Sequence, residues 1–199
     1  MGFGLLLIGY FLANVLPVIS IFSAAMLLGF PLISVALYRL APYHKRFYLS
    51  WLFSLPALLF GLYYTLCSLA GVGVIPAFAI FSGTAFDVIE LIYLGYTLAL
   101  YALILWSVAS LSAELGLFRT QSAAWRNLTF LVIYHVLFFI VKLPIPFFAA
   151  HATSFVLPMT VLRYLCVFLN VWLFFRCYLD ILPEGSDKEP VQKRKEKKQ

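Results

Sequence analysis

The sequence predicts an all-α fold, a polytopic bundle of transmembrane helices. Of the 199 residues, 64% are apolar and only 11% are charged, and the apolar residues form long unbroken runs. A soluble domain has about 45–50% apolar and about 25% charged residues. A water-soluble fold of this size could not bury the additional apolar surface of this chain. In lipid only helices and closed barrels satisfy their backbone polar groups, and barrel strands would alternate polar and apolar residues. The unalternated runs therefore predict helices.

Four apolar runs are each long enough to cross a bilayer. A hydrocarbon core about 30 Å thick needs about 20 helical residues at a rise of about 1.5 Å per residue. Gly71 and Gly73 close the first run, and Pro144 and Pro146 are expected to break the third helix near its outer end. The four predicted spans are residues 47–69, 86–111, 128–150 and 155–179.

The opening stretch, residues 3–40, carries no charge until its last two positions. It is too long for one span and barely long enough for two. Pro17 removes a backbone donor and disfavours helix at the residue before it, so we expect a break near residues 14–17. A short segment over 3–13 and a full-length one over 20–40 would follow, giving six spans in total. One long kinked first helix, and hence five spans, is the alternative.

Basic and uncharged loops alternate along the chain, which predicts the orientation. The first basic loop holds Arg39 and residues 44–46, the second spans 112–127, and the third is the C-terminal tail; the loops at 71–85 and 151–154 carry no fixed charge. By the positive-inside rule the basic loops and the C-terminus face the cytoplasm, and with six spans the N-terminus does too. Aromatic residues near these ends suit an interfacial belt: Tyr38, Tyr43, Tyr48, Trp51, Trp125 and Tyr178.

The chain divides into a transmembrane domain, residues 1–182, and a polar tail, residues 183–199, that we expect to be disordered. Six of the 14 basic residues lie in this tail and the other eight lie mostly at the ends of apolar runs, so the net charge of +6 does not indicate nucleic-acid binding. Its basic residues are expected either to anchor the topology or to contact anionic lipid headgroups. The predicted headgroup contacts are Lys193, Arg194, Lys195, Lys197 and Lys198.

Ionisable residues also lie inside the predicted spans. A charge near the bilayer centre costs about 2.5–3.5 kcal/mol, so such residues usually face the bundle interior and pair. Two acids and two bases lie at similar depth in the outer half of the bilayer, and a histidine and an asparagine stand seven residues from the bases, on the same helix faces. Thr97 and Tyr101 continue the acidic face inward. The predicted polar cluster is Asp87, Glu90, His135, Lys142, Arg163 and Asn170.

This cluster has two interpretations. It is either a set of interhelical salt bridges that fix the packing, or a ligand or ion path. In the second case Lys142 and Arg163 would hold an anion, and Asp87 and Glu90 would carry protons or cations. His135 has no second histidine or carboxylate three or four positions away, so the sequence predicts no metal site.

The start of the chain resembles uncharacterised multi-pass membrane proteins of Gram-positive anaerobes. The resemblance lies in Gly2-Phe3-Gly4-Leu5-Leu6-Leu7-Ile8-Gly9-Tyr10-Phe11 and in Leu37-Tyr38-Arg39-Leu40, and covers about the first fifty residues. It implies a bacterial plasma membrane and an early helical hairpin, and it implies no particular activity.

Three function classes remain open. The first is a structural or accessory subunit of a membrane complex, with a membrane-protein partner or a second copy of the chain. The second is a small permease or substrate-capture subunit that uses the polar cluster. The third is an intramembrane lipid-modifying enzyme, although the sequence has no hydrolase motif, phosphate-binding loop or CxxC pair. No cofactor is predicted, and the one expected partner common to all three is the lipid bilayer.

Overall fold

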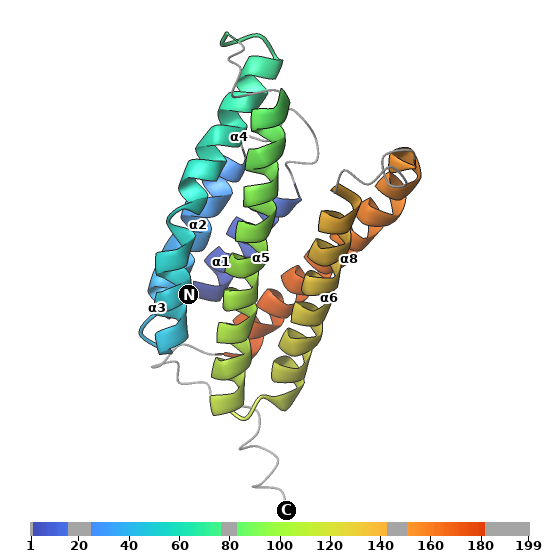
Figure 1. Ribbon diagram of the computed structural model, residues 1–199. Helices are drawn as coiled ribbons and strands as arrows, with labels where there is room; N and C mark the ends of the chain where they lie inside the picture. Colours follow the sequence, from blue (N-terminus) through green and yellow to red (C-terminus); the bar gives the residue numbers. More distant parts are fainter. Residues whose placement is uncertain (1, 16–24, 77–82, 143–150, 182–199) are drawn as a thin grey trace, which may run out of the picture.

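Figure 1 shows the computed structural model of the chain, which describes residues 2–15, 25–76, 83–142 and 151–181. Within these ranges all regular structure is helical, which confirms the all-α part of the prediction. The helices are α1 (Gly2–Asn14), α2 (Ala25–Leu40), α3 (Lys45–Ser54), α4 (Ala57–Gly71), α5 (Gly83–Glu114), α6 (Phe118–Lys142) and α8 (Ala152–Asp180).

Four helical units are long and apolar enough to cross a membrane. The first is Lys45–Gly71, which consists of α3 and α4 together. The other three are α5, α6 and the segment Thr153–Asp180 of α8. The first unit is interrupted at Pro56, because a proline nitrogen has no hydrogen to donate. Large apolar side chains point outward from these units: Leu59, Leu157 and Phe168 are 64–72% exposed. A surface this apolar is what a lipid environment requires.

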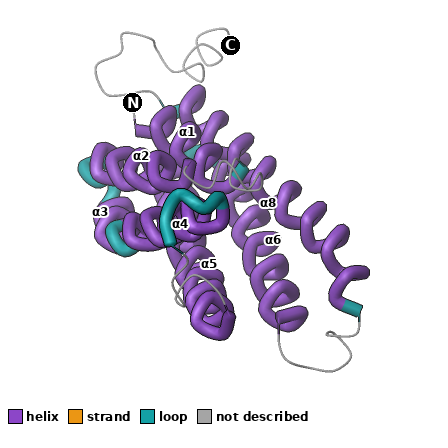
Figure 2. Tube along the Cα trace, turned by 90° about the horizontal axis from the view of Figure 1, so that it is seen from above, coloured by secondary structure: helices purple, strands orange, loops and turns teal. Residues whose placement is uncertain are grey.

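The helices pack in a closed ring. Each element contacts the next, in the order α1, α2, α3 with α4, α5, α6, α8, and α8 closes the ring by packing against α1. Seen from above, α6 and α8 lie together on one side of the molecule and α2, α3 and α4 on the other (Figure 2). The side chains that point into this ring form the core, among them Tyr10, Phe30, Ile104 and Phe174, each at most 2% exposed.

The opening stretch folds into an antiparallel hairpin. Helix α1 ends at Asn14, at the break that the sequence predicts, and the start of the span predicted over 20–40 lies partly outside the described residues. A Cβ added to Gly2 would lie 2.5 Å from Leu40 Cγ, and one added to Gly29 would lie 2.6 Å from the Ala13 nitrogen. The start of α1 therefore meets the end of α2, so the two segments are a hairpin and not one long helix.

The helix that contains the predicted third span begins earlier than the sequence predicts. The sequence placed a loop at 112–127 and a span at 128–150, but α5 continues to Glu114 and α6 already begins at Phe118. The turn is short because Gly116 adopts a left-handed conformation, with φ +69°, which lets the Leu117 amide donate to the Ser112 carbonyl at 2.8 Å. The predicted break at Pro144 and Pro146 lies outside the described residues.

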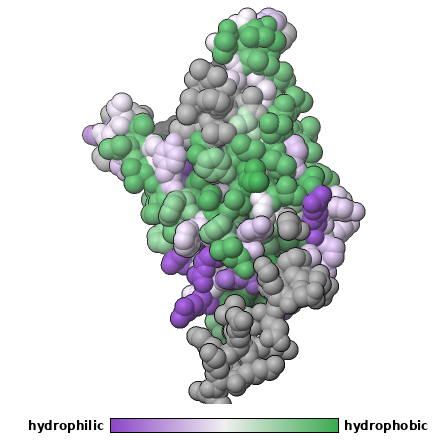
Figure 3. All heavy atoms as spheres, turned by 180° about the vertical axis from the view of Figure 1, so that it is seen from behind, coloured by the Kyte–Doolittle hydropathy of each residue, from purple (hydrophilic) through white to green (hydrophobic). Residues whose placement is uncertain are grey.

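One end of the bundle carries the basic turns and is called the basic end below. The end of α2, the start of α3, the α5–α6 turn and the end of α8 meet there, in the lower part of Figure 1. Hydrophilic side chains gather at this end, beneath a largely hydrophobic middle (Figure 3). Tyr38, Tyr43, Tyr48, Trp125 and Tyr178, five of the six predicted belt aromatics, are exposed on this part of the chain.

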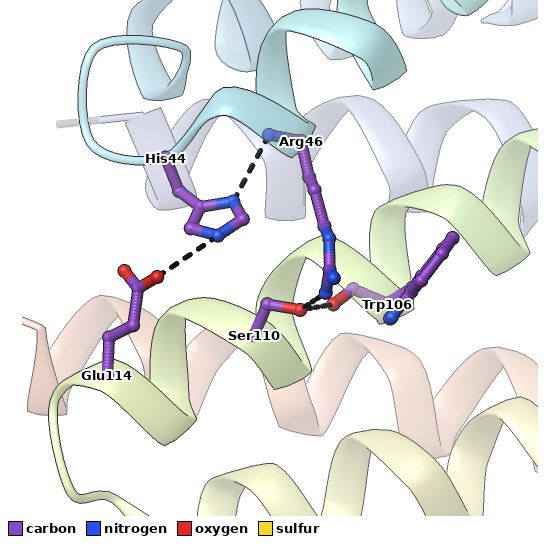
Figure 4. A network of polar contacts seen from close by, with 5 residues as sticks. All are labelled: His44, Arg46, Trp106, Ser110 and Glu114. Atoms are coloured by element: carbon purple, nitrogen blue, oxygen red, sulfur yellow. Dashed lines mark hydrogen bonds and ion pairs between the residues drawn. The ribbon is translucent and has the colours of Figure 1, made fainter.

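A polar network ties the start of α3 to the end of α5 at the basic end (Figure 4). His44 Nδ1 accepts a hydrogen bond from the Arg46 amide at 3.1 Å and so caps α3, while His44 Nε2 lies 3.3 Å from Glu114 Oε1. The Arg46 guanidinium donates to Ser110 Oγ and lies 4.3 Å from the centre of the Trp106 ring. Two residues of this basic turn, His44 and Arg46, therefore hold α3 against α5.

Candidate functional site

A polar cavity lies inside the ring of helices, on the side of the bundle away from the basic end. Its volume is about 240 Å³, and α1, α2, α4, α5, α6 and α8 all contribute to its wall. We call it the tyrosine cavity, because five tyrosines line it. Its polar lining residues are Tyr10, Asn14, Tyr64, Glu90, Tyr93, Thr97, Tyr101, Tyr134, His135, Arg163 and Cys166.

Helix α5 supplies the longest part of the wall. Glu90, Tyr93, Thr97 and Tyr101 recur at spacings of three or four residues, which puts them on one helix face. Thr97 Oγ1 turns back to donate to its own helix, at 2.9 Å from the Tyr93 carbonyl. The face that the sequence predicted from Glu90 through Thr97 to Tyr101 is therefore the face that lines the cavity.

Two asparagine–tyrosine pairs fix the inner end of the cavity. Asn14 Nδ2 donates to the Tyr101 hydroxyl at 2.9 Å, and Asn170 Nδ2 donates to the Tyr10 hydroxyl at 2.9 Å. The Tyr10 and Tyr101 rings also meet edge to face, with centroids 5.0 Å apart. In both hydrogen bonds the tyrosine oxygen is the acceptor, so each hydroxyl keeps its own hydrogen to donate elsewhere.

One ion pair links α5 to α6. Lys142 Nζ lies 2.8 Å from Glu90 Oε2, and the two side chains are 46% and 31% exposed. The pairing that the sequence predicts between intramembrane acids and bases is thus present for these two residues. Because Lys142 already neutralises Glu90, this pair contributes no net charge to the cavity.

Arg163 enters the cavity from α8 without a carboxylate partner. No Asp or Glu among the described residues lies within 4.0 Å of its guanidinium nitrogens. It shares the cavity wall with Tyr93 and Tyr101 of α5 and His135 of α6. Counting Glu90, Lys142 and Arg163, the fixed charges at the cavity sum to −1 + 2 = +1. The cavity therefore favours an anion.

His135 is buried in the cavity wall and is 6% exposed. Its Nδ1 lies 2.8 Å from the Leu131 carbonyl oxygen, which can only accept, so Nδ1 carries a hydrogen. Nε2 is then the ring atom left to interact with a ligand. Among the described residues no three His, Cys, Asp or Glu side chains gather closely enough to hold a metal ion.

The predicted cluster is only partly assembled. Glu90, His135 and Arg163 line the cavity, Lys142 reaches it through Glu90, and Asn170 reaches it through Tyr10. Asp87 is not part of the assembled cluster. Its side chain is exposed near the start of α5 and does not line the cavity. Asp87 lies nearly one helical turn closer to the start of α5 than Glu90, and at that level its side chain is exposed.

Several residues that line the cavity were not predicted from the sequence. Tyr10 and Asn14 are four residues apart on α1, a spacing that puts both on one face and was a signal in the sequence. Tyr64 and Tyr134 had no comparable signal, because their faces of α4 and α6 are defined only by neighbouring helices. The predicted headgroup contacts at Lys193, Arg194, Lys195, Lys197 and Lys198 lie outside the described residues.

No family model matches the chain, and neither a curated protein nor a solved structure shows detectable similarity to it.

Proposed function

We propose that this chain is an integral membrane protein that captures a small organic anion in the tyrosine cavity, as a permease or as the substrate-capture subunit of a transporter. The observation that carries the proposal is Arg163, a cation inside the bundle with no carboxylate within 4.0 Å in the described part of the chain. Ionisable groups placed within membrane spans are costly and commonly mark substrate paths.

The rest of the lining suits a small polar ligand with a flat apolar part. Tyrosine rings offer apolar faces, and their hydroxyls and His135 offer directed hydrogen bonds. A volume of about 240 Å³ is just below the range of about 300–1,000 Å³ typical of drug-sized ligands. A small carboxylate held by Arg163 in a bidentate pair is the ligand class that this combination favours.

The proposal includes six membrane crossings in a bacterial plasma membrane, with both termini in the cytoplasm. The antiparallel hairpin of α1 and α2 supports the sixth crossing, because it brings the start of α1 to the basic end of the bundle. With this orientation, the tyrosine cavity lies on the side away from the cytoplasm.

The first experiment measures anion binding to the protein in nanodiscs. A panel of small carboxylates, each beside its neutral amide, is scored by the shift in unfolding temperature. A ligand present at about 100 times its Kd stabilises by about 2.7 kcal/mol, a shift of several degrees. We expect at least one carboxylate, and not its amide, to stabilise the native protein, and Arg163→Gln to lose this effect.

The matched control keeps the cavity charge unchanged. The double variant Glu90→Gln/Lys142→Gln removes a carboxylate and its paired ammonium together, so the net charge of +1 and Arg163 both remain. It should retain carboxylate binding. If no carboxylate stabilises the native protein, or if Arg163→Gln responds like the native protein, anion capture is wrong.

A structural role for the charges is the second candidate, and the Glu90–Lys142 ion pair favours it. The variant Asp87→Asn/Glu90→Gln/Lys142→Met/Arg163→Met removes all four charges and leaves none unpaired. If the charges serve a ligand, this variant should unfold at the same or a higher temperature than the native protein, since buried ion pairs are often replaceable by apolar groups without loss. A clear loss of stability would instead support a structural or accessory subunit.

A further inference from the structure

A second hollow lies at the basic end, between the start of α6 and the end of α8, and is separate from the tyrosine cavity. Its volume is about 500 Å³. We call it the arginine groove, since arginines from both helices line it. Its polar and aromatic walls are Arg119, Ser122, Arg126 and Asn127 of α6 and Trp172 and Arg176 of α8.

The charge in the arginine groove is only partly balanced. Arg176 Nε lies 3.8 Å from Asp180 Oδ2, one turn further along α8. Arg119 and Arg126 are exposed and have no carboxylate within 4.0 Å among the described residues. Three arginines against one aspartate leave a formal charge of 3 − 1 = +2. Three like charges around one hollow repel each other unless an anion lies between them.

Asn127 adds a second, independent feature. Its side chain is only 2% exposed, its Nδ2 donates to the Leu169 carbonyl of α8 at 2.8 Å, and its Oδ1 has no hydrogen-bond partner among the described residues. A buried acceptor is rarely left unpaired in a native structure. Asn127 lines the groove, and a small rotation of its side-chain amide would present this shielded oxygen to a hydroxyl group of the occupant.

The outer rim of the arginine groove is apolar and lies at the end of the bundle. Trp172 is 53% exposed and Phe118 is 75% exposed, and Leu173 is buried between the helices. Exposed aromatic side chains at a helix end are typical of the membrane–water interface. The groove therefore combines cations, an unpaired acceptor and an apolar rim at the level of lipid headgroups.

We infer that the arginine groove binds one anionic phospholipid whose headgroup carries hydroxyl groups. The phosphate diester lies between the arginines of α6 and α8, where guanidinium groups can hold it with charge-assisted hydrogen bonds. A headgroup hydroxyl donates to Asn127 Oδ1, and the acyl chains follow the apolar rim into the bilayer. The lipid thus bridges two helices that differ in sequence position by about fifty residues.

The test measures lipid binding to the detergent-solubilised full-length protein by native mass spectrometry. The probes are phosphatidylglycerol and phosphatidylcholine with identical acyl chains. We expect phosphatidylglycerol to bind at least about tenfold tighter to the native protein. Arg119→Gln/Arg176→Gln, which removes one cation from each helix, should abolish that preference, because each basic residue near a headgroup contributes about fivefold.

The matched control removes two cations from the same end of the bundle but outside the arginine groove. Arg39 and Lys45 are both exposed, so Arg39→Gln/Lys45→Gln should leave the preference for phosphatidylglycerol within about twofold of native. Circular dichroism checks that both double variants are folded. An equal loss in the two variants would mean diffuse attraction between a basic surface and acidic lipid, and would overturn the site.

Two further probes separate the parts of the proposal. Phosphatidylmethanol has the same phosphate diester but no headgroup hydroxyl, and should bind about threefold more weakly than phosphatidylglycerol, since one neutral hydrogen bond is lost. Equal binding would overturn the contact with Asn127. Soluble glycerol 3-phosphate should not compete at concentrations at which the lipid binds. Competition there would assign the groove to a soluble phosphate ester and overturn the lipid as its occupant.

Discussion

Single residues should affect the stability of this bundle most where they form a hydrogen bond with a buried polar atom. Asn170 is 1% exposed, and within the described part of the chain its one side-chain hydrogen bond is the one that its Nδ2 donates to the Tyr10 hydroxyl. Its Oδ1 has no partner among the residues that the structure describes, so this asparagine is already under-satisfied. Tyr10 also packs edge to face on Phe174, with ring centroids 5.3 Å apart. The Tyr10 hydroxyl therefore decides whether a buried amide in the centre of the ring has any hydrogen bond at all.

Tyr10→Phe tests this at the residue scale. The change keeps the ring packing but leaves the Asn170 amide without a partner, and an unsatisfied buried group costs about 1–3 kcal/mol. We expect a loss of stability of this size, measured as a lower midpoint of thermal unfolding in detergent micelles.

The double variant Tyr10→Phe/Asn170→Leu is the control for that loss. It removes both partners and replaces the amide with an apolar group of similar size, which can be nearly neutral. It should therefore be more stable than Tyr10→Phe alone. If the double variant is the less stable of the two, the hydrogen bond is not the source of the effect.

At the scale of elements, the α1–α2 hairpin depends on two glycines. A Cβ on Gly9 would lie 2.8 Å from the Ile33 nitrogen and 2.9 Å from the Gly29 carbonyl oxygen, and a Cβ on Gly29 would lie 2.6 Å from the Ala13 nitrogen. These are backbone atoms, which cannot rotate away. Small residues at such crossings let helices approach closely in a membrane, where apolar burial gives no driving force between helices.

Gly29→Ala should therefore separate α1 from α2. Overpacking of this kind costs about 1–3 kcal/mol, and we expect the unfolding midpoint to fall accordingly. The effect should extend to the tyrosine cavity, because α1 supplies Tyr10 and Asn14. Carboxylate binding, measured as above, should weaken together with stability.

Gly95→Ala on α5 is the control for the glycine effect. Nothing lies within 4 Å of a Cβ at Gly95, so the added methyl group meets no neighbour. Alanine is also the better helix former by about 0.8–1.0 kcal/mol in water. The variant should be as stable as the native protein or more so. Equal destabilisation by Gly29→Ala and Gly95→Ala would show that close packing of the hairpin is not what Gly29 provides.

At the scale of the whole molecule, the question is how many times the chain crosses the bilayer. Four units are long enough by themselves, whereas α1 and α2 have 13 and 16 described residues. Six crossings place the N-terminus on the same side as the basic end, and five place it on the opposite side. The hairpin geometry favours six.

An N-terminal epitope tag and single cysteines test the topology. In a background with Cys67, Cys166 and Cys177 replaced by alanine, Val72→Cys should react with an impermeant maleimide in intact cells, and Leu115→Cys should react only after lysis. Both positions are exposed in the described structure. With six crossings, added protease should digest the tag only after lysis. Digestion in intact cells would show five crossings, and a reversed labelling pattern would overturn the orientation.

The sequence by itself determined the features that depend on local composition. Apolar run length predicted the four long units, and Pro17 with its neighbours predicted the end of α1 at Asn14, because bilayer thickness and proline geometry act on short stretches of chain. The spacing of Glu90, Thr97 and Tyr101 predicted one face of α5, because helix periodicity is also local. The same local reading placed the start of α6 at 128 instead of Phe118, because arginines in the first turns of a helix resemble loop residues.

Only the tertiary structure decided which faces meet. Glu90 pairs with Lys142, whereas Arg163 has no carboxylate within 4.0 Å in the described ranges. This choice of partners depends on the rotation of three helices about their axes, which the length of an apolar run does not encode. In lipid all helix faces are apolar, so the pattern that marks the buried side of a soluble helix is weak here. Small residues and hydrogen bonds between distant residues, such as Gly29 against Ala13 and Asn170 on Tyr10, set those rotations and thereby create the tyrosine cavity.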